Sequence, residues 1–140
     1  MNTAKGASNL NHKKIHESAE DYLETILVLE KKKGSVRAVD IASEMNFSRP
    51  SVSVAMKHFR ESGLITVSKD GHITLTGEGR TLAVATYERH KLLTSLLISI
   101  GVDEDTAKKD ACGIEHHISE ITFAKLTQLA KRLDTEGSEK

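Results

Sequence analysis

The chain has 140 residues, which is enough for one compact domain or for two small ones that share a core. Its 20 basic and 20 acidic residues cancel, so the net charge indicates no partner. The single cysteine excludes an internal disulfide and is typical of a reducing cytosol. No apolar run approaches the roughly 18–20 residues of a membrane span, so we expect a soluble, cytoplasmic protein without a membrane partner.

The first predicted helix follows a polar segment. Residues 1–17 are aperiodic and basic and predict a flexible arm. Ser18 matches a helix N-cap, with Asp21 three residues later as its capping-box partner, and apolar residues at helical spacing predict a helix that Gly34 ends. Asp21 and Glu24 share the opposite face. Taken alone, this pair is more typical of a solvated helix surface than of a binding site.

The next segment predicts a helix-turn-helix. Small and β-branched residues over Ser35–Glu44 favour a short helix, which Met45-Asn46-Phe47 interrupts. Ser48 then matches the N-cap of a second helix, which tolerates Pro50 in its first turn. The apolar residues expected to face inward on this helix are Val52, Ala55, Met56 and Phe59. Its outer face carries hydroxyl and basic groups without a carboxylate.

A two-stranded hairpin completes a winged helix-turn-helix. Leu64–Ser68 is short and β-branched, Asp70-Gly71 favours a tight turn, and His72–Leu75 returns. We expect the second helix to enter a DNA major groove and the hairpin tip to contact phosphates. The residues expected to contact DNA are Arg37, Ser48, Arg49, Pro50, Ser51, Ser53, Val54, Lys57 and Lys69. Winged helices also serve as protein-interaction modules, which is the alternative for this part of the chain.

The second half of the chain predicts three helices. Thr76-Gly77-Glu78-Gly79 opens a long helix, from Arg80 to about Ser99, that is apolar on more than one side. This exceeds what a small domain can cover by itself, so we expect the helix to lead into a dimer core. His90 lies on the apolar stripe, where a lone histidine is usually a packed core residue. Asp103 caps the next helix, and an amphipathic helix ends the chain.

A cluster of metal donors lies on the second of these helices. Cys112, Glu115 and His116 have i, i+3 and i+4 spacing, so a helix places them on one face, with Ile114 and Ile118 holding the opposite side against a core. A thiol, a carboxylate and an imidazole on one face form half of a metal site. Alone, this triplet is as typical of an exposed polar face as of a metal site.

Several stretches together resemble the metal-dependent repressors of the diphtheria toxin repressor and manganese transport regulator type. They are Ser18-Ala19-Glu20-Asp21-Tyr22-Leu23-Glu24, Leu75-Thr76-Gly77-Glu78-Gly79-Arg80, Arg89-His90-Lys91-Leu92-Leu93 and Cys112-Gly113-Ile114-Glu115-His116-His117. The resemblance runs from about His16 to Leu133.

The resemblance implies a mainly α fold. A winged helix-turn-helix DNA-binding domain with a two-stranded hairpin (18–76) would be followed by an all-helical dimerisation and metal-binding domain (77–140), without the SH3-like domain of longer relatives. It also implies a homodimer through the C-terminal helices that binds double-stranded operator DNA when a divalent metal lies between the two domains. The metal ligands that it implies are Asp21, Glu24, His90, Cys112, Glu115 and His116.

The implied ligand set is a hybrid of two branches of the family. The manganese branch has a glutamate where this chain has Cys112, and the diphtheria branch has a cysteine there but a methionine in place of Asp21. A thiolate favours softer ions than oxygen donors do, so we expect Fe²⁺ or Mn²⁺, with Zn²⁺ or Co²⁺ as substitutes in vitro and one or two ions per subunit. Thr94 and Lys108 replace ligands of the diphtheria branch's ancillary site, which is therefore not expected.

The implied function is a transcriptional repressor of metal-homeostasis genes. One alternative is a winged-helix regulator that responds to a non-metal effector, with Asp21 and Glu24 solvated and His90 packed. A metalloenzyme with Glu115 as general base is the other. Six protein ligands would leave little room for a substrate, and no second cleft is evident, so no enzyme activity is expected.

Overall fold

The computed structural model describes residues 19–138, so the expected arm (1–17) and the Ser18 cap lie outside the described residues. The chain forms two compact units that divide between Thr86 and Tyr87. No helix in the described residues has the length and apolar character needed to cross a membrane. The expected domain boundary after Thr76 remains a prediction.

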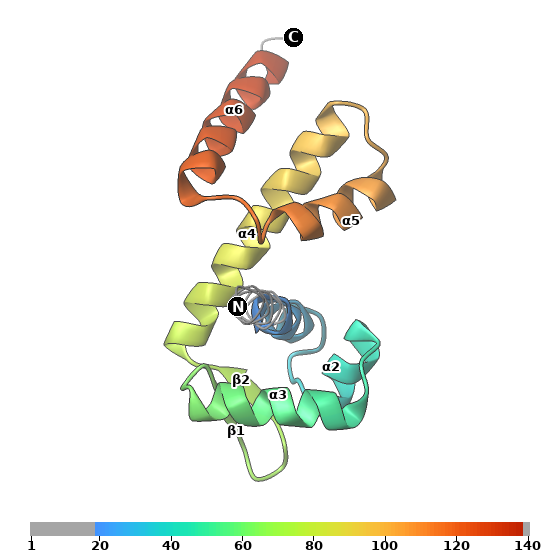
Figure 1. Cartoon of the computed structure of the whole chain (residues 1–140), viewed down its shortest axis with the longest axis vertical. Helices are drawn as coiled ribbons and strands as arrows, with labels where there is room; N and C mark the ends of the chain where they lie inside the picture. Colours follow the sequence, from blue (N-terminus) through green and yellow to red (C-terminus); the bar gives the residue numbers. More distant parts are fainter. Residues whose placement is uncertain (1–18, 139–140) are drawn as a thin grey trace, which may run out of the picture. The chain divides into compact units, whose positions relative to one another are not determined.

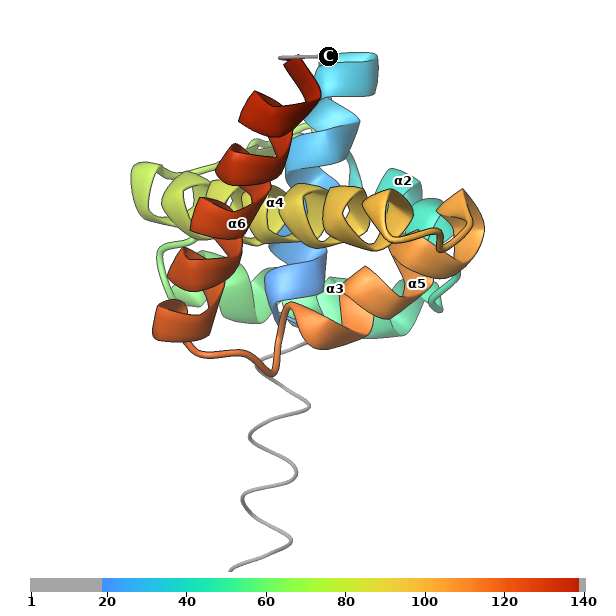
Figure 2. The same ribbon diagram turned by 90° about the horizontal axis from the view of Figure 1, so that it is seen from above.

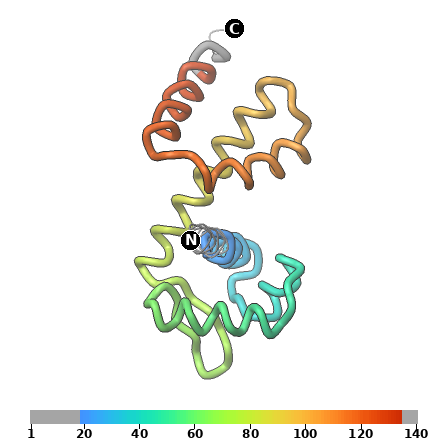
Figure 3. The backbone as a smooth tube through the Cα atoms, viewed as in Figure 1, coloured from blue at the N-terminus to red at the C-terminus, as the bar shows by residue number. Residues whose placement is uncertain are grey.

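The first unit has the element order of a winged helix-turn-helix. A first helix (residues 19–33) precedes α2 (Ala38–Met45) and α3 (Arg49–Glu61), and then come β1 (Ile65–Val67) and β2 (Ile73–Leu75) (Figure 1). The strands pair antiparallel, and Figure 3 shows the chain turning back between them. The positive φ of Gly71, +84°, permits this turn. The predicted fold class is confirmed.

Aliphatic side chains from each of these elements form the core of the first unit. The fully buried ones are Leu23, Ile26, Val36, Ile41, Val52 and Ile65. Burial of one such side chain contributes about 1.5–3 kcal/mol. On α3, Val52, Met56 and Phe59 are buried as predicted, while Ala55 is half-buried. This core fixes the orientation of α3 relative to the hairpin, and so leaves one face of α3 in solvent.

The short helix predicted over Ser35–Glu44 begins later than expected. Gly34 ends the first helix with a φ of +84°, and Val36 then forms an isolated β-bridge with Ile73, whose N–H donates to the Val36 carbonyl at 2.8 Å. The prediction of helix for residues 35–37 is therefore wrong. A β-branched residue beside a strand gains a ladder hydrogen bond that a helix N-terminus does not offer it.

The long helix α4 (Gly77–Ser99) begins three residues before the predicted start. Thr76 caps it: its hydroxyl oxygen accepts from the Gly79 N–H at 3.1 Å, and the hydroxyl donates to the Gly63 carbonyl at 2.7 Å. Gly79 is buried against the hairpin, where a Cβ would overlap the Leu64 carbonyl oxygen. The glycine at this position therefore lets the start of α4 lie directly on the chain that enters β1.

The second unit consists of α4 from Tyr87 onward, α5 (Glu104–Ile114) and α6 (Glu120–Ser138). Figures 1 and 2 show both later helices beside this part of α4. Asp103 caps α5 as predicted, since its carboxylate accepts from the Thr106 N–H at 3.0 Å, and this hydrogen bond lowers the pKa of the Asp103 carboxyl group.

The end of α5 corrects a second prediction. The helix stops at Ile114, so Glu115 keeps helical backbone angles only as the C-cap and His116 lies in the following turn. Ile114 is 36% exposed and does not anchor the helix. Ala107 and Ala111 are buried instead.

Candidate metal centre and DNA-binding face

The candidate metal centre of the second unit is built around the carboxylate of Glu115. This side chain is fully buried, and it lies between two imidazoles. His90 Nδ1, from α4, lies 3.1 Å from Oε2, and His116 Nε2 lies 3.3 Å from Oε1. His90 therefore faces a carboxylate rather than packing in an apolar core, which was the alternative left open by the sequence.

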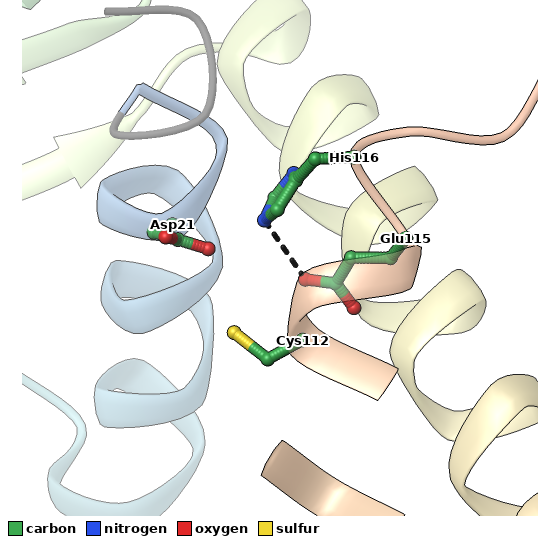
Figure 4. Close-up of side chains that lie close together, drawn as sticks. All are labelled: Asp21, Cys112, Glu115 and His116. Atoms are coloured by element: carbon green, nitrogen blue, oxygen red, sulfur yellow. Dashed lines mark ion pairs between the residues drawn. The ribbon is translucent and has the colours of Figure 1, made fainter. Parts of the chain in front are cut away.

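Cys112 adds a thiol to this cluster. It lies one turn before Glu115 on α5 and is exposed. Figure 4 shows its sulfur on the same side as the Glu115 carboxylate and the His116 ring, and one ligand atom of each of the three lies within 4.8 Å of the others. The sequence spacing predicted this grouping correctly, although His116 reaches it from the turn and not from the helix.

The donor set fits a divalent cation. Glu115 Oε1 is buried and has no hydrogen-bond partner among the described residues, because the His116 ring nitrogen near it lacks hydrogen-bond geometry. A buried carboxylate oxygen without a partner is costly unless a cation balances it. Carboxylate, imidazole and thiolate groups at this separation are ligands that Mn²⁺, Fe²⁺ and Zn²⁺ accept. The observation favours a metal site over an ordinary ion pair.

Asp21 and Glu24 belong to the first unit. They lie three residues apart on the first helix and are half-buried, since Tyr22 and Leu23 beside them are buried in the core. Their carboxylates therefore share one side of this helix. The two side chains are therefore less exposed than the sequence pair alone predicted, because it was more typical of a solvated helix surface. Their participation in metal binding remains a prediction.

The DNA-binding face predicted on α3 is exposed. Ser48 caps the helix, its hydroxyl oxygen accepting from the Ser51 N–H at 3.3 Å while the hydroxyl donates to Ser51 Oγ at 2.8 Å. The other predicted contact residues of α3 and the hairpin are all exposed: Arg49, Pro50, Ser53, Val54, Lys57 and Lys69. Arg37 lies at the start of α2, with Nη2 3.2 Å from His72 Nε2. Their contacts with DNA remain a prediction.

Arg60 is a candidate DNA-contact residue that the sequence analysis missed. Together with Lys57 it lines a crevice of about 320 Å³ between α3 and the hairpin, whose floor includes Met56 and Ile73. Two cations one turn apart beside a wing are suited to a phosphate. The i, i+3 spacing of Lys57 and Arg60 was a signal that could have identified the pair.

A winged helix-turn-helix together with a buried carboxylate, imidazole and thiol cluster defines the class of metal-responsive DNA-binding proteins. Residues 14–73 match the iron-dependent repressor N-terminal DNA-binding domain, and residues 76–139 match the iron-dependent repressor metal-binding and dimerisation domain. The chain belongs to this family of metal-dependent transcriptional repressors, the diphtheria toxin repressor and manganese transport regulator family, whose members are not enzymes.

Relatives of the chain are transcriptional regulators. The transcriptional regulator MntR of Escherichia coli O157:H7 is 38% identical over 107 residues, 76% of this chain and 69% of the relative. The HTH-type transcriptional regulator MntR of Lysinibacillus sphaericus is 33% identical over 117 residues, 84% of each chain. A solved manganese-dependent transcriptional repressor in complex with manganese superposes with a TM-score of 0.74 at 28% identity, over 81% of this chain. The superposed part is 52% of the solved repressor, so this chain spans about half of the length of that repressor.

Proposed function

We propose that this protein represses transcription of metal-homeostasis genes when Fe²⁺ or Mn²⁺ is bound, with Asp21, Glu24, His90, Cys112, Glu115 and His116 as the ligands. The observation that carries the proposal is the fully buried Glu115, which lies between two imidazoles and has one carboxylate oxygen without a hydrogen bond among the described residues. Such a group fits a cation, and the chain's family is one of metal-dependent repressors.

The proposed switch depends on charge. Asp21, Glu24 and Glu115 are three carboxylates, and they repel one another if they share a pocket without a counter-charge. A bound divalent cation supplies that charge and accepts donors from both units. Because Asp21 and Glu24 lie on the helix that packs in the winged-helix core, their coordination restrains the first unit relative to the second. The two recognition helices of a dimer then match major grooves one turn, ~34 Å, apart.

Cys112 is the residue that we expect to set the metal preference. Thiolates favour softer ions, and the affinity of a given site rises from Mn²⁺ through Fe²⁺ toward Cu²⁺. The manganese branch of the family has a glutamate at the position of Cys112. Replacing the oxygen donor by sulfur is therefore expected to move the preference toward Fe²⁺, while the other five ligands keep the site competent for Mn²⁺.

The proposed dimer surface is the apolar side of α4 and α6. The two helices border a groove of about 460 Å³ whose lining includes Leu92, Leu96 and Leu133. Leu133 and Leu129 are 40% and 38% exposed, respectively. The matching family domain is one that dimerises, so a second copy of the chain is the proposed occupant.

The proposal is tested by fluorescence anisotropy with a labelled duplex selected from a randomised library. Binding would be measured in EDTA and after addition of Mn²⁺, anaerobic Fe²⁺ or Zn²⁺. We expect the cognate metal to raise DNA affinity at least tenfold, about 1.4 kcal/mol of coupling. In Cys112→Glu, the order of the metals should shift toward Mn²⁺. Equal affinity with and without metal would instead support a regulator with a non-metal effector.

A further inference from the structure

Arg89 is next to His90 on α4 and contacts the segment that carries Glu115 and His116. Its Nη1 lies 3.3 Å from the main-chain oxygen of Glu115 and 3.5 Å from that of Ile118. The same guanidinium lies over the ring of Phe123, 5.2 Å from the ring centroid, in the first turn of α6. One side chain of α4 therefore contacts both the ligand segment (residues 115–118) and α6.

Two adjacent residues of α4 contact Glu115, one at its side-chain carboxylate and the other at its main-chain oxygen. His90 contacts the carboxylate, and Arg89 donates to the main-chain oxygen of the same residue. The carbonyl groups at the end of α5 lack intrahelical donors and carry partial negative charge, which a guanidinium with several donors in one plane can satisfy. Both Arg89 hydrogen bonds are near the long limit for such bonds, so a small movement of the ligand segment makes or breaks them.

We propose that Arg89 is a positioning residue that makes the placement of α6 depend on the ligand segment. When Glu115 and His116 are fixed as ligands, the carbonyl groups of Glu115 and Ile118 are fixed with them. Arg89 then takes one orientation, and its guanidinium restrains the ring of Phe123. Since α6 also carries Leu129 and Leu133 of the proposed dimer surface, Arg89 links metal binding to dimer geometry. This inference rests on the proposed function.

The chain contains a matched control for this role. Lys91 is also on α4 and lies over an aromatic ring, 5.4 Å from the centroid of Tyr87. Both members of that pair belong to α4, so the contact bridges no other element. If any cation–aromatic contact on α4 sufficed, Lys91→Ala and Arg89→Ala would behave alike. If bridging matters, only Arg89→Ala changes the response of α6.

The test uses the full chain and Co²⁺, whose absorption reports ligand geometry and the thiolate of Cys112. Wild type, Arg89→Ala, Arg89→Lys and Lys91→Ala would be titrated with Co²⁺, and amide hydrogen exchange of residues 120–130 would be followed without metal and at saturation. We expect wild type and Lys91→Ala to gain protection in α6 on metal addition. Arg89→Ala should bind Co²⁺ about tenfold more weakly, with an altered spectrum, and gain no protection in α6 at saturation.

Arg89→Lys keeps the charge but loses the planar group that reaches two carbonyl oxygens and covers Phe123. It should therefore bind Co²⁺ nearly as well as wild type while losing most of the α6 response. If circular dichroism shows that Arg89→Ala is unfolded, the α6 protection of Arg89→Lys provides the test of the inference. A full metal-dependent gain of α6 protection in a folded Arg89 variant would overturn the inference.

The same data separate this inference from the proposed function. Wild type that binds no Co²⁺ through the Cys112 thiolate would contradict the metal site itself. Wild type that binds the ion but shows no change in α6 would overturn only the role of Arg89.

Discussion

The two units of this chain differ in what their interiors are made of. In the first, aliphatic side chains from three helices and a hairpin are fully buried, and helix caps satisfy the exposed backbone groups. In the second, one buried side chain among the described residues is a large aliphatic one, that of Leu93. The others are small or polar, and they belong to Ala107, Ala111 and Glu115. Its largest fully buried side chain is thus a glutamate.

This difference shows which unit needs groups from outside the chain. A winged-helix core of this kind supports itself, since its largest fully buried side chains are all aliphatic. A unit of three helices that buries a carboxylate and leaves Ile121 75% exposed does not. We infer that a metal ion balances the carboxylate and that a second copy of the chain covers apolar surface.

Glu115→Gln should abolish metal binding while sparing the fold. The amide keeps the size of the side chain but removes its charge, so we expect Mn²⁺ affinity to fall at least 100-fold, about 2.7 kcal/mol. The free energy of unfolding without metal should not fall, because a neutral amide is easier to bury than a carboxylate. Titration calorimetry and urea unfolding measure the two quantities. Glu120→Gln, on the exposed first turn of α6, is the control, and equal affinity in both variants would contradict the site.

Gly79→Ala should destabilise the first unit through packing alone. The added methyl group would overlap the Leu64 carbonyl, and overpacking of this kind costs about 1–3 kcal/mol. Urea unfolding in EDTA removes any contribution of metal. Gly77→Ala is a matched control two residues away, since a Cβ there meets no atom within 4 Å. The explanation fails if the two variants are equally stable.

The winged-helix fold could be predicted from sequence because its signals are local. Ser48 before Pro50, Asp70-Gly71 and the spacing of apolar residues on α3 each report a structure formed within a few residues. The start of α2 was mispredicted because Val36 pairs with Ile73, far along the chain. A pairing of this kind depends on tertiary structure, which helix periodicity does not report.

The metal centre was predictable only in part. The spacing of Cys112, Glu115 and His116 located the cluster, but the apolar spacing around His90 favoured a packed core residue, and only the family resemblance implied that it is a ligand. The structure places His90 3.1 Å from Glu115. The local sequence does not distinguish a histidine that contacts a carboxylate of another helix from a histidine that packs in an apolar core. The role of Arg89 depends on two main-chain oxygens and a ring on separate elements, so spacing along the chain could not reveal it.

Leu129→Glu should weaken self-association of the second unit. A charge in a surface that becomes buried between two copies must be desolvated, so the dimer dissociation constant should rise at least tenfold. Sedimentation equilibrium measures it. Lys125→Glu changes the charge by two units, twice the change in Leu129→Glu, but at an exposed position of α6, and it should have a smaller effect. Association that is insensitive to Leu129→Glu would exclude this side of α6 as the interface.

Val54→Ala should change the preference for DNA sequence and have little effect on the affinity for DNA in general. Val54 is 59% exposed among polar groups on α3, so its methyl groups are available for a thymine methyl group in the major groove. We expect a loss of about 1 kcal/mol that disappears when one thymine is replaced by deoxyuridine. Val39→Ala, 46% exposed on α2, is the control. An effect that persists on every uracil-substituted duplex would contradict this contact.

Asp40→Asn should have the smallest effect, confined to the first unit. The carboxylate accepts from Lys33 Nζ at 2.7 Å and from the Arg37 N–H at 2.9 Å, and these contacts lower the pKa of Asp40. A lowered pKa adds stability above the unfolded pKa, which is lost as pH falls through the folded value. At pH 7 the variant should lose under about 1 kcal/mol in urea unfolding, and the difference should disappear as pH falls below the folded pKa of Asp40.

The proposed switch requires that metal binding and DNA binding are coupled across the two units, and linkage tests this coupling most directly. The Mn²⁺ dissociation constant would be measured with and without a saturating selected duplex, alongside the DNA dissociation constant with and without Mn²⁺. We expect both dissociation constants to fall by the same factor, at least tenfold, because the coupling is reciprocal. A Mn²⁺ affinity unchanged by DNA would contradict it.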